Sequence, residues 1–328
     1  FFTQSLHESG INLYKDLLDY KCSKPTQEKY IEIKVIIMKF KKMLTLAAIG
    51  LSGFGLVACG NQSAASKQSA SGTIEVISRE NGSGTRGAFT EITGILKKDG
   101  DKKIDNTAKT AVIQNSTEGV LSAVQGNANA IGYISLGSLT KSVKALEIDG
   151  VKASRDTVLD GEYPLQRPFN IVWSSNLSKL GQDFISFIHS KQGQQVVTDN
   201  KFIEAKTETT EYTSQHLSGK LSVVGSTSVS SLMEKLAEAY KKENPEVTID
   251  ITSNGSSAGI TAVKEKTADI GMVSRELTPE EGKSLTHDAI ALDGIAVVVN
   301  NDNKASQVSM AELADVFSGK LTTWDKIK

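Results

Sequence analysis

The chain has 328 residues, of which 39% are hydrophobic and 23% are charged, so it can build a core divided between two lobes or domains. Its formal net charge is −1 and aromatic residues make up only 6%, which leaves neither a basic face nor stacking platforms for nucleic acid. No short internal repeat is present, which excludes a solenoid.

The N-terminal part has the layout of an exported protein. Residues 1–37 show no clear pattern, and we interpret them as an upstream, non-structural segment before a start at Met38. Lysines after Met38, followed by an uncharged stretch up to Cys59, predict a signal peptide over 38–58. The polar residues 59–71 predict a flexible tether. A membrane-spanning anchor or a buried helix is the alternative interpretation, although the apolar stretch is shorter than the ~20 residues of a typical span.

The sequence LVACG around Cys59 resembles the lipobox of bacterial lipoproteins. The resemblance implies cleavage before Cys59 and attachment of a lipid to its sulfur. The other cysteine, Cys22, lies before the cleavage site. The mature chain is therefore expected to carry a single, lipidated cysteine, to contain no disulfide, and to be anchored to the outer side of the bacterial cell membrane.

The remaining chain alternates between strand-like and helix-like segments. Strands are predicted over 73–78, 110–115, 130–136, 169–175, 220–226, 246–254, 268–274 and 294–300. Helices are predicted after the GSGT sequence, after Ser116 as an N-cap, and over 181–200, 228–245, 257–267 and 309–319. This alternation predicts an α/β architecture with mostly parallel sheets. The segment 206–219 is rich in Thr and Ser and predicts a linker between two compact parts.

Three of these strands are followed by a short loop of Ser, Thr and Gly and then by a helix. The loops read RENGSGT (79–85), GSTS (225–228) and TSNGSSAG (252–259). Each places free backbone N–H groups and hydroxyls at a helix N-terminus, which attracts anions. Arg79 adds a charged fork of donors. Together the loops predict a site for a small tetrahedral oxyanion, although each loop is also compatible with an ordinary helix cap.

A serine hydrolase is the alternative of another class. Residues 255–259 read GSSAG, which matches the G-x-S-x-G pattern of a nucleophile elbow with Ser257 as the nucleophile. His287 is the single histidine after Ser257, and no HGGG-like segment is present. Metal-binding motifs and a Walker loop are also absent from the sequence. We therefore expect no catalytic residue, no metal and no cofactor.

Several motifs together resemble the phosphate-binding lipoprotein family of phosphate-specific ABC transporters, PstS. The resemblance is carried by LSVVGSTS, by TSNGSSAG with DIGMVSREL, by FSGKLTTW, by RENGSGT and by AIGYISL, and it covers nearly all of 72–328. It implies a periplasmic-binding-protein-like fold of type II with a ligand cleft between two lobes. It also implies a monomeric, extracytoplasmic protein that captures inorganic phosphate, delivers it to the permease subunits of an ABC importer, and is not an enzyme.

The order of the motifs departs from that family, in which the GSTS strand comes first and GSGT follows the GKLTTW segment. Moving 218–328 ahead of 72–217 would restore the family order, so we interpret the chain as a circular permutant; a shuffled order is the alternative. The implied lobes are 72–167 with 297–328, which carries the GSGT loop, and 168–296, which carries the GSTS and GSSAG loops.

The family's binding residues are transferred position by position. The resemblance implies phosphate ligands at Thr227, Ser228, Ser256, Ser274, Arg79, Ser83, Gly84 and Thr85. Arg275, Glu276 and Asn81 are possible further ligands. Asn81 stands where the family often has an aspartate, and Arg275 stands where it has another. A carboxylate that accepts the phosphate proton is then expected from Glu276 or Glu80, and a different arrangement is the alternative. Sulfate, molybdate or tungstate is the alternative ligand.

Overall fold

A computed structural model describes residues 72–99, 102–205 and 209–327. The predicted upstream segment, signal peptide, lipidation site and tether lie outside the described residues. Within the ranges described, no helix is both long enough and apolar enough to cross a membrane.

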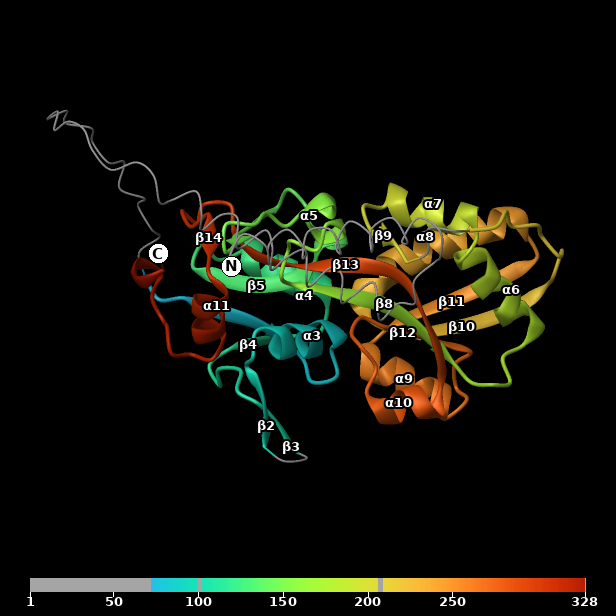
Figure 1. Cartoon of the computed structure of the whole chain (residues 1–328), viewed down its shortest axis with the longest axis horizontal. Helices are drawn as coiled ribbons and strands as arrows, with labels where there is room; N and C mark the ends of the chain where they lie inside the picture. Colours follow the sequence, from blue (N-terminus) through green and yellow to red (C-terminus); the bar gives the residue numbers. More distant parts are fainter. Residues whose placement is uncertain (1–71, 100–101, 206–208, 328) are drawn as a thin grey trace, which may run out of the picture. The chain divides into compact units, whose positions relative to one another are not determined.

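Helices and strands alternate along most of the described chain (Figure 1). The strands are β1 (Glu75–Arg79), β2 (Leu96–Asp99), β3 (Lys102–Asp105), β4 (Val112–Gln114), β5 (Ala130–Ser135), β6 (Val143–Ala145), β7 (Glu147–Ile148), β8 (Gln166–Trp173), β9 (Ile203–Glu204), β10 (Gly219–Gly225), β11 (Val247–Ser253), β12 (Ile270–Val273), β13 (Thr286–Asn300) and β14 (Gln307–Val308). The helices are α3 (Gly84–Ile92), α4 (Thr117–Gln125), α5 (Arg155–Leu159), α6 (Lys179–Ile188), α7 (Lys191–Asp199), α8 (Thr227–Glu243), α9 (Ser256–Lys264), α10 (Pro279–Ser284) and α11 (Met310–Phe317), with short 3-10 turns η1 (Leu136–Ser138) and η2 (Trp324–Lys326).

The main sheet has the strand order β11-β10-β12-β8-β13-β5-β1-β4. The strands at both ends of this order pair in parallel, as the βα alternation predicts. The central strands β8 and β13 pair antiparallel to each other and to their outer neighbours, which the prediction of mostly parallel sheets missed. Strand β13 runs from β8 to β5 and so connects the two parallel parts (Figure 1).

Two large apolar cores lie along this sheet, and a third, smaller cluster contains Val172, Ile260, Val263, Val273 and Leu285. The first core contains the stacked rings of Phe89 and Tyr133 together with the β-branched residues of β5 and the second half of β13. The second core contains Phe184, Phe187 and Tyr240, packed under helices α6 and α8. Strand β13 contributes residues to both cores, whereas β8 contributes Phe169 and Ile171 to the second core and follows directly on Leu165 of the first, so these two strands cross from one core to the other.

Two predicted elements differ in extent from the structure. The helix predicted over 181–200 is interrupted, because the Ser190 hydroxyl accepts a hydrogen bond from Gly193 N and starts a new helix, α7. Strand β13 begins at Thr286, eight residues before the predicted start at 294. Its first residues are exposed and polar, so they lack the apolar pattern that marks a strand in sequence.

The described part of the predicted linker is held in place by hydrogen bonds and ring contacts. Residues 209–218 have no regular secondary structure. However, Tyr212 N donates to Gln192 Oε1 (2.8 Å), Gln192 Nε2 donates to Tyr212 O (3.2 Å), and the Tyr212 hydroxyl donates to Asp183 (2.7 Å). The tyrosine ring also packs against Phe187 and Tyr240. This segment is therefore part of the second core.

The first and last described segments are neighbours. Thr73 and Thr323 form an isolated antiparallel bridge. Ile74 N donates to Thr322 O (2.8 Å), and Trp324 N donates to Gly72 O (3.1 Å). The Trp324 ring is fully buried in the first core, so the C-terminal segment is firmly packed there.

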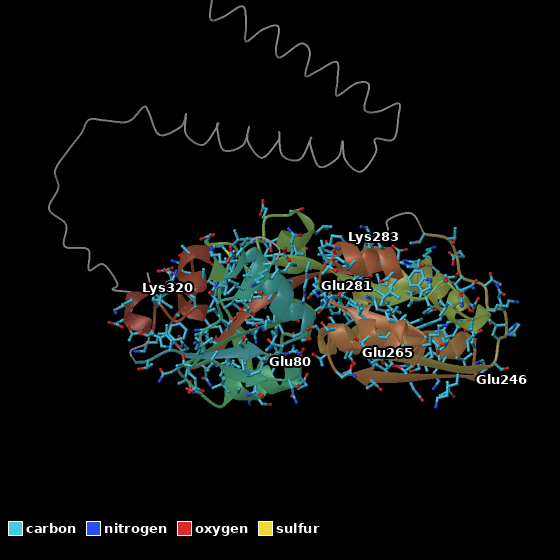
Figure 2. The ribbon with its side chains drawn as sticks, turned by 90° about the horizontal axis from the view of Figure 1, so that it is seen from below. Glu80, Glu246, Glu265, Glu281, Lys283 and Lys320 are labelled. Carbon is cyan, nitrogen blue, oxygen red and sulfur yellow. The ribbon has the colours of Figure 1, made fainter. Side chains whose placement is uncertain are left out.

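Charged side chains such as Glu246, Glu265, Lys283 and Lys320 are exposed at the surface (Figure 2).

Candidate oxyanion-binding site

Helices from the two cores meet through their first residues. The Thr85 hydroxyl of α3 lies 2.8 Å from the Ser228 hydroxyl of α8. The Thr117 hydroxyl of α4 lies 3.3 Å from Thr227 Oγ1 and 3.4 Å from Ser228 Oγ. Since α3 and α4 pack on the first core and α8 packs on the second, these contacts join the two cores at the helix N-termini.

Three more hydroxyls come from the N-cap of α8 (Ser226), the first residue of α9 (Ser256) and the residue after β12 (Ser274). Ser226 Oγ donates to Ser274 Oγ (2.9 Å), and Ser274 N donates to Ser256 Oγ (3.1 Å). All three residues are at least 97% buried. We call the group of side chains that meets here the hydroxyl cluster. Its members are Thr85, Thr117, Ser226, Thr227, Ser228, Ser256 and Ser274.

Gly84 allows α3 to approach the cluster closely. A Cβ at this position would lie 2.2 Å from Ser256 Oγ and 2.6 Å from Ser274 Oγ, so any side chain would displace both hydroxyls. Gly255, which precedes α9, has φ of +103°, a conformation that favours glycine. Ser257 N donates to Gly82 O (3.1 Å), which brings the two glycine-containing loops together.

The four helix N-termini leave donors directed at the site. Gly84, Thr117, Thr227 and Ser256 are the first residues of α3, α4, α8 and α9. In the part of the chain that the structure describes, the backbone N–H groups of these four residues donate to no protein acceptor. Each helix also contributes about half a positive charge at this end. The arrangement therefore offers many neutral donors to one small anion.

Arg79 adds a permanent charge. Its side chain is only 2% exposed, and its Nε and Nη2 donate to the two carboxylate oxygens of Glu80 at 2.8 and 2.9 Å. Nη2 also donates to Thr227 Oγ1 (3.0 Å), which directs the guanidinium towards the cluster. The Arg79 backbone N donates to the Tyr133 hydroxyl (3.3 Å), and burial raises the pKa of Tyr133, which keeps that hydroxyl protonated.

The Ser83 side chain has a structural role in this arrangement. Its hydroxyl caps α3 by accepting a hydrogen bond from Arg86 N (3.3 Å). Ser83 is 5% exposed and lies next to Gly84 and Thr85. Its side chain therefore orients the helix whose N-terminus faces the cluster, and the structure shows no contact between this hydroxyl and the others of the cluster.

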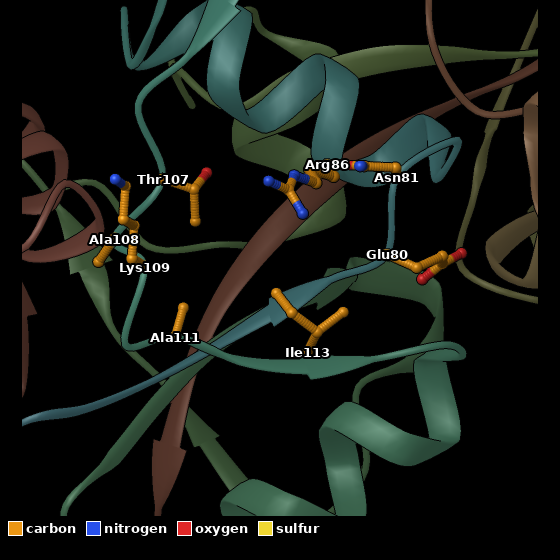
Figure 3. A pocket seen from close by; sticks show the side chains of 8 residues that line it. All are labelled: Glu80, Asn81, Arg86, Thr107, Ala108, Lys109, Ala111 and Ile113. Atoms are coloured by element: carbon orange, nitrogen blue, oxygen red, sulfur yellow. The ribbon is translucent and has the colours of Figure 1, made fainter.

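Asn81 lies at a pocket whose lining contains no member of the hydroxyl cluster. It is exposed, and Figure 3 shows this pocket from close by. The lining residues of this pocket are Glu80, Asn81, Arg86, Thr107, Ala108, Lys109, Ala111 and Ile113. Glu80 contributes both to this pocket and to the ion pair with Arg79, so it stands between the pocket and the cluster.

Arg275 and Glu276, considered above as possible ligands, lie outside the cluster. Arg275 makes a two-point ion pair with Glu281 of α10, at 2.7 and 2.9 Å. Glu276 is exposed at the surface. Figure 2 labels Glu281 on α10 and Glu80, which directly follows β1. The pairing with Glu281 holds the guanidinium of Arg275 against α10, which a sequence-based transfer of roles does not take into account.

The hydrolase alternative lacks its geometry. Ser257 and His287 are both exposed, and among the described residues no hydrogen bond joins the Ser257 hydroxyl to a histidine or a carboxylate. A nucleophilic serine requires such a base within hydrogen-bond reach. The described ranges also contain no group of three or more His, Cys, Asp or Glu side chains that could hold a metal.

Two members of the cluster, Thr117 and Ser226, were not among the predicted ligands. Thr117 is 3% exposed and follows the N-cap Ser116, whose hydroxyl accepts from Gly119 N (3.0 Å). The sequence contains a signal for Thr117, because the predicted strand over 110–115 is also followed by Ser, Thr and a helix. This loop has no glycine before the helix, however, and so its sequence is also that of an ordinary helix cap.

The fold and the converging helix N-termini are those of a solute-binding protein. Residues 36–192 and 210–327 match the family described as PBP superfamily domain, which confirms the predicted periplasmic-binding-protein-like α/β fold. The chain is 45% identical over 295 residues to "Phosphate-binding protein PstS 2" of Streptococcus agalactiae, an alignment that covers 88% of this chain and 99% of the relative. The chain therefore belongs to the PstS family of phosphate-binding proteins, a family of binding proteins and not of enzymes.

Other relatives match over shorter stretches. "Phosphate-binding protein PstS" of Bacillus subtilis is 31% identical over 113 residues, which cover 34% of this chain and 38% of the relative. A solved structure of a putative phosphate ABC transporter substrate-binding protein with bound phosphate, from Clostridium perfringens, is 41% identical with a TM-score of 0.36. It is matched over 40% of this chain, and this chain spans about half of its length.

Proposed function

We propose that this chain is the extracytoplasmic component of an ABC importer that captures inorganic phosphate and delivers it to the permease. The observation that carries the proposal is the convergence of four helix N-termini and Arg79 on the hydroxyl cluster, in a chain of the PstS family. Dipoles and hydrogen bonds would hold the anion, since the whole chain is nearly neutral.

Phosphate is proposed to bind among the backbone N–H groups of the four helices. The donors would be Gly84, Thr227 and Ser256 with their neighbours Thr85 and Ser228, and Arg79 would supply the charged contact. Thr117 joins this set because its buried hydroxyl contacts both Thr227 and Ser228. Ser274 is hydrogen-bonded to Ser226 and Ser256, and its hydroxyl would be a further donor to the phosphate.

We assign the choice of phosphate over sulfate to Glu80. At neutral pH phosphate retains a proton that a carboxylate can accept, whereas sulfate, molybdate and tungstate offer no O–H donor. Glu80 is only 22% exposed and is directed at Arg79, whereas Glu276 is exposed and Asn81 faces the outer pocket. Each carboxylate oxygen of Glu80 accepts one hydrogen bond from Arg79 and retains a second lone pair.

The two cores are proposed to move as two lobes that close on the ligand. The proposed lobes are 72–167 with 297–328, and 168–296. The separate cores and the two crossing strands support this division, except that Ile203, Ile295 and Ala296 of the second segment pack in the first core. Hinge closure of this kind buries a ligand between lobes without disturbing either core.

The order of the lobe segments is proposed to be a circular permutation of the wider family's order. The chain aligns with 99% of the Streptococcus agalactiae relative but with only 38% of the Bacillus subtilis relative, as expected if only one contiguous part can be aligned at a time. The bridge between Thr73 and Thr323 places the first and last described segments side by side. Permutation is tolerated where chain ends lie together at the surface.

Membrane attachment is proposed through a lipid on Cys59. The support is the lipobox-like sequence and the polar stretch after it. Mass spectrometry of the protein isolated from a membrane fraction tests this assignment. A diacylglyceryl mass on Cys59 is expected; an unmodified Cys59 or an uncleaved segment 38–58 contradicts it.

The binding proposal is tested by titration calorimetry of a chain comprising residues 60–328. We expect saturable heat with phosphate and much weaker binding of sulfate, molybdate and tungstate. Tighter binding of one of the other oxyanions would identify that anion as the ligand of this site and overturn the assignment to phosphate.

A further inference from the structure

A buried ion pair lies in register between the crossing strands. Arg167 of β8 and Asp293 of β13 are directly paired in the antiparallel ladder. Arg167 Nη2 lies 3.1 Å from Asp293 Oδ2, and Nε lies 3.3 Å from the same oxygen. Each side chain is only 1% exposed. The pair is electrically neutral as a whole and well shielded from water.

The pair occupies the point where one core ends and the other begins. Leu165, directly before β8, belongs to the first core, and Phe169 of β8 belongs to the second. On β13, Ala291 belongs to the second core and Ile295 to the first. Arg167 and Asp293 lie midway between these residues on their strands. A bend of the crossing strands between the two cores would therefore occur at the position of this pair.

Hydrogen bonds extend from the pair into both halves. Asp293 Oδ1 accepts from the hydroxyl of Ser135 (2.9 Å), the last residue of β5, and from Gly137 N (3.5 Å) of the η1 turn that follows this strand of the first core. On the other side, Arg167 Nη1 donates to the Ser274 carbonyl (3.0 Å). Ser274 belongs to the hydroxyl cluster. A continuous path thus leads from the first core, through both crossing strands, to the proposed phosphate site.

Stability alone is a weak reason for this arrangement. Removing two charges from water costs several kcal/mol per ion, and apolar residues often replace such pairs without loss of stability. Burial lowers the pKa of Arg167 and raises that of Asp293, which reflects this cost. The Arg167 guanidinium lies 5.2 Å from the centre of the Phe169 ring, a surface that an apolar side chain could also cover.

We infer that Arg167 and Asp293 are positioning residues that hold the Ser274 loop in its binding geometry and couple it to the crossing strands. This inference rests on the proposed phosphate site at the hydroxyl cluster. The guanidinium fixes the Ser274 carbonyl, and the Ser274 hydroxyl and N–H then keep their places beside Ser226 and Ser256. Asp293 holds the guanidinium and ties it to Ser135.

The test compares three variants of the 60–328 chain: Arg167→Met, Asp293→Asn, and the two substitutions combined. Phosphate affinity is measured by calorimetry, the dissociation rate by stopped flow, and folding by thermal unfolding. Arg155→Met is the matched control, because Arg155 also pairs with a carboxylate, Glu204, but lies about one-third exposed and away from the cluster. The combined variant contains no unpaired buried charge and is expected to fold.

We expect the combined variant to bind phosphate at least about tenfold more weakly, mainly through faster dissociation, while Arg155→Met stays within about twofold of the wild type. Wild-type affinity in a folded combined variant would overturn the inference, because the path to Ser274 would then be irrelevant to binding. Failure of all three variants to fold would assign the pair to stability and also overturn it. If the wild type itself bound no phosphate, the proposed function would fail instead.

Discussion

The hydroxyls of Thr85 and Ser228 lie 2.8 Å apart although the two residues are 143 positions apart in the chain. Thr85 is the second residue of α3, a helix on the first core, and Ser228 is the second residue of α8, a helix on the second. A contact between the first turns of two helices brings their positive ends together, which is unfavourable unless an anion lies nearby. This pair therefore marks the place at which an anionic ligand would stabilise the contact between the two halves.

Removal of the Arg79 guanidinium tests the charged contact. Arg79→Ala is expected to weaken phosphate binding by about 2–5 kcal/mol, because a buried anion loses its charged partner and Glu80 loses its own. Calorimetry measures the change. Lys109→Ala, which removes a positive charge at the outer pocket, is the control and should leave the affinity within about twofold. An unchanged affinity in Arg79→Ala would place Arg79 outside the site.

The close approach of α3 is tested by Gly84→Ala. The added Cβ would lie 2.2 Å from Ser256 Oγ, so the two halves could no longer meet as they do here. We expect phosphate affinity to fall by more than about tenfold, while thermal stability changes little because alanine favours a helix. Gly87→Ala is the matched control, since its Cβ would meet only the flexible side chain of Arg275, at 3.2 Å. Equal affinities for both variants would contradict the proposed closure.

Thr117→Val tests the fourth helix. Valine keeps the branched shape and removes the hydroxyl that contacts Thr227 and Ser228. A loss of about 1–2 kcal/mol of binding energy is expected. Thr90→Val serves as the control, because Thr90 is equally buried on α3 but its hydroxyl donates to Arg86 O. A loss of the same size in both variants would indicate a general effect of removing a buried hydroxyl.

Part of the candidate site can be recognised from the sequence because its signal is local. Arg79, Gly84, Thr227 and Ser256 follow strands and begin or precede helices, and that pattern is readable without a structure. The meeting of the loops depends on pairing over long distances, which only the fold supplies. Arg275 illustrates the limit: its direction is decided by Glu281, six residues away, and nothing in the local pattern distinguishes this partner from a ligand.

The helices and strands also divide into those that the local sequence predicts and those that depend on the fold. The capped helices α4 and α11 begin directly after their predicted N-terminal serines, Ser116 and Ser309. The helix predicted over 181–200 is divided by a local turn, in which Ser190 caps α7 and Gly193 lies so close to Phe187 O that a Cβ would approach it to 2.1 Å. The antiparallel direction of the crossing strands is not predicted, because the direction of a strand leaves no trace in its own residues.

Glu80→Gln tests the origin of anion selectivity. The amide retains the size of the side chain but offers one acceptor oxygen instead of two and adds a donor. The affinity ratio of phosphate to sulfate is expected to fall by about tenfold. Competition between the two anions in one calorimetric series measures this ratio. Glu276→Gln is the control at the exposed acid, and a change of the ratio in this variant alone would reassign the selectivity to Glu276.

The ionisation of Asp293 predicts a pH dependence of stability. Burial raises the pKa of Asp293 to about 6, above its ordinary value of 3.8. The folded chain therefore binds this proton more tightly than the unfolded chain does, and the contribution of Asp293 to the free energy of unfolding falls as the pH rises from about 4 to about 6. Denaturant unfolding of the wild type and of Asp293→Asn isolates this contribution, because asparagine does not titrate. A difference that rises with pH in this window would show that the pKa is lowered instead.

Titration calorimetry of the 60–328 chain with phosphate and sulfate tests the central claim most directly. The account predicts saturable, one-site binding of phosphate, clearly tighter than that of sulfate, which disappears or weakens strongly in Gly84→Ala. Absence of saturable heat with phosphate in a folded chain would contradict it.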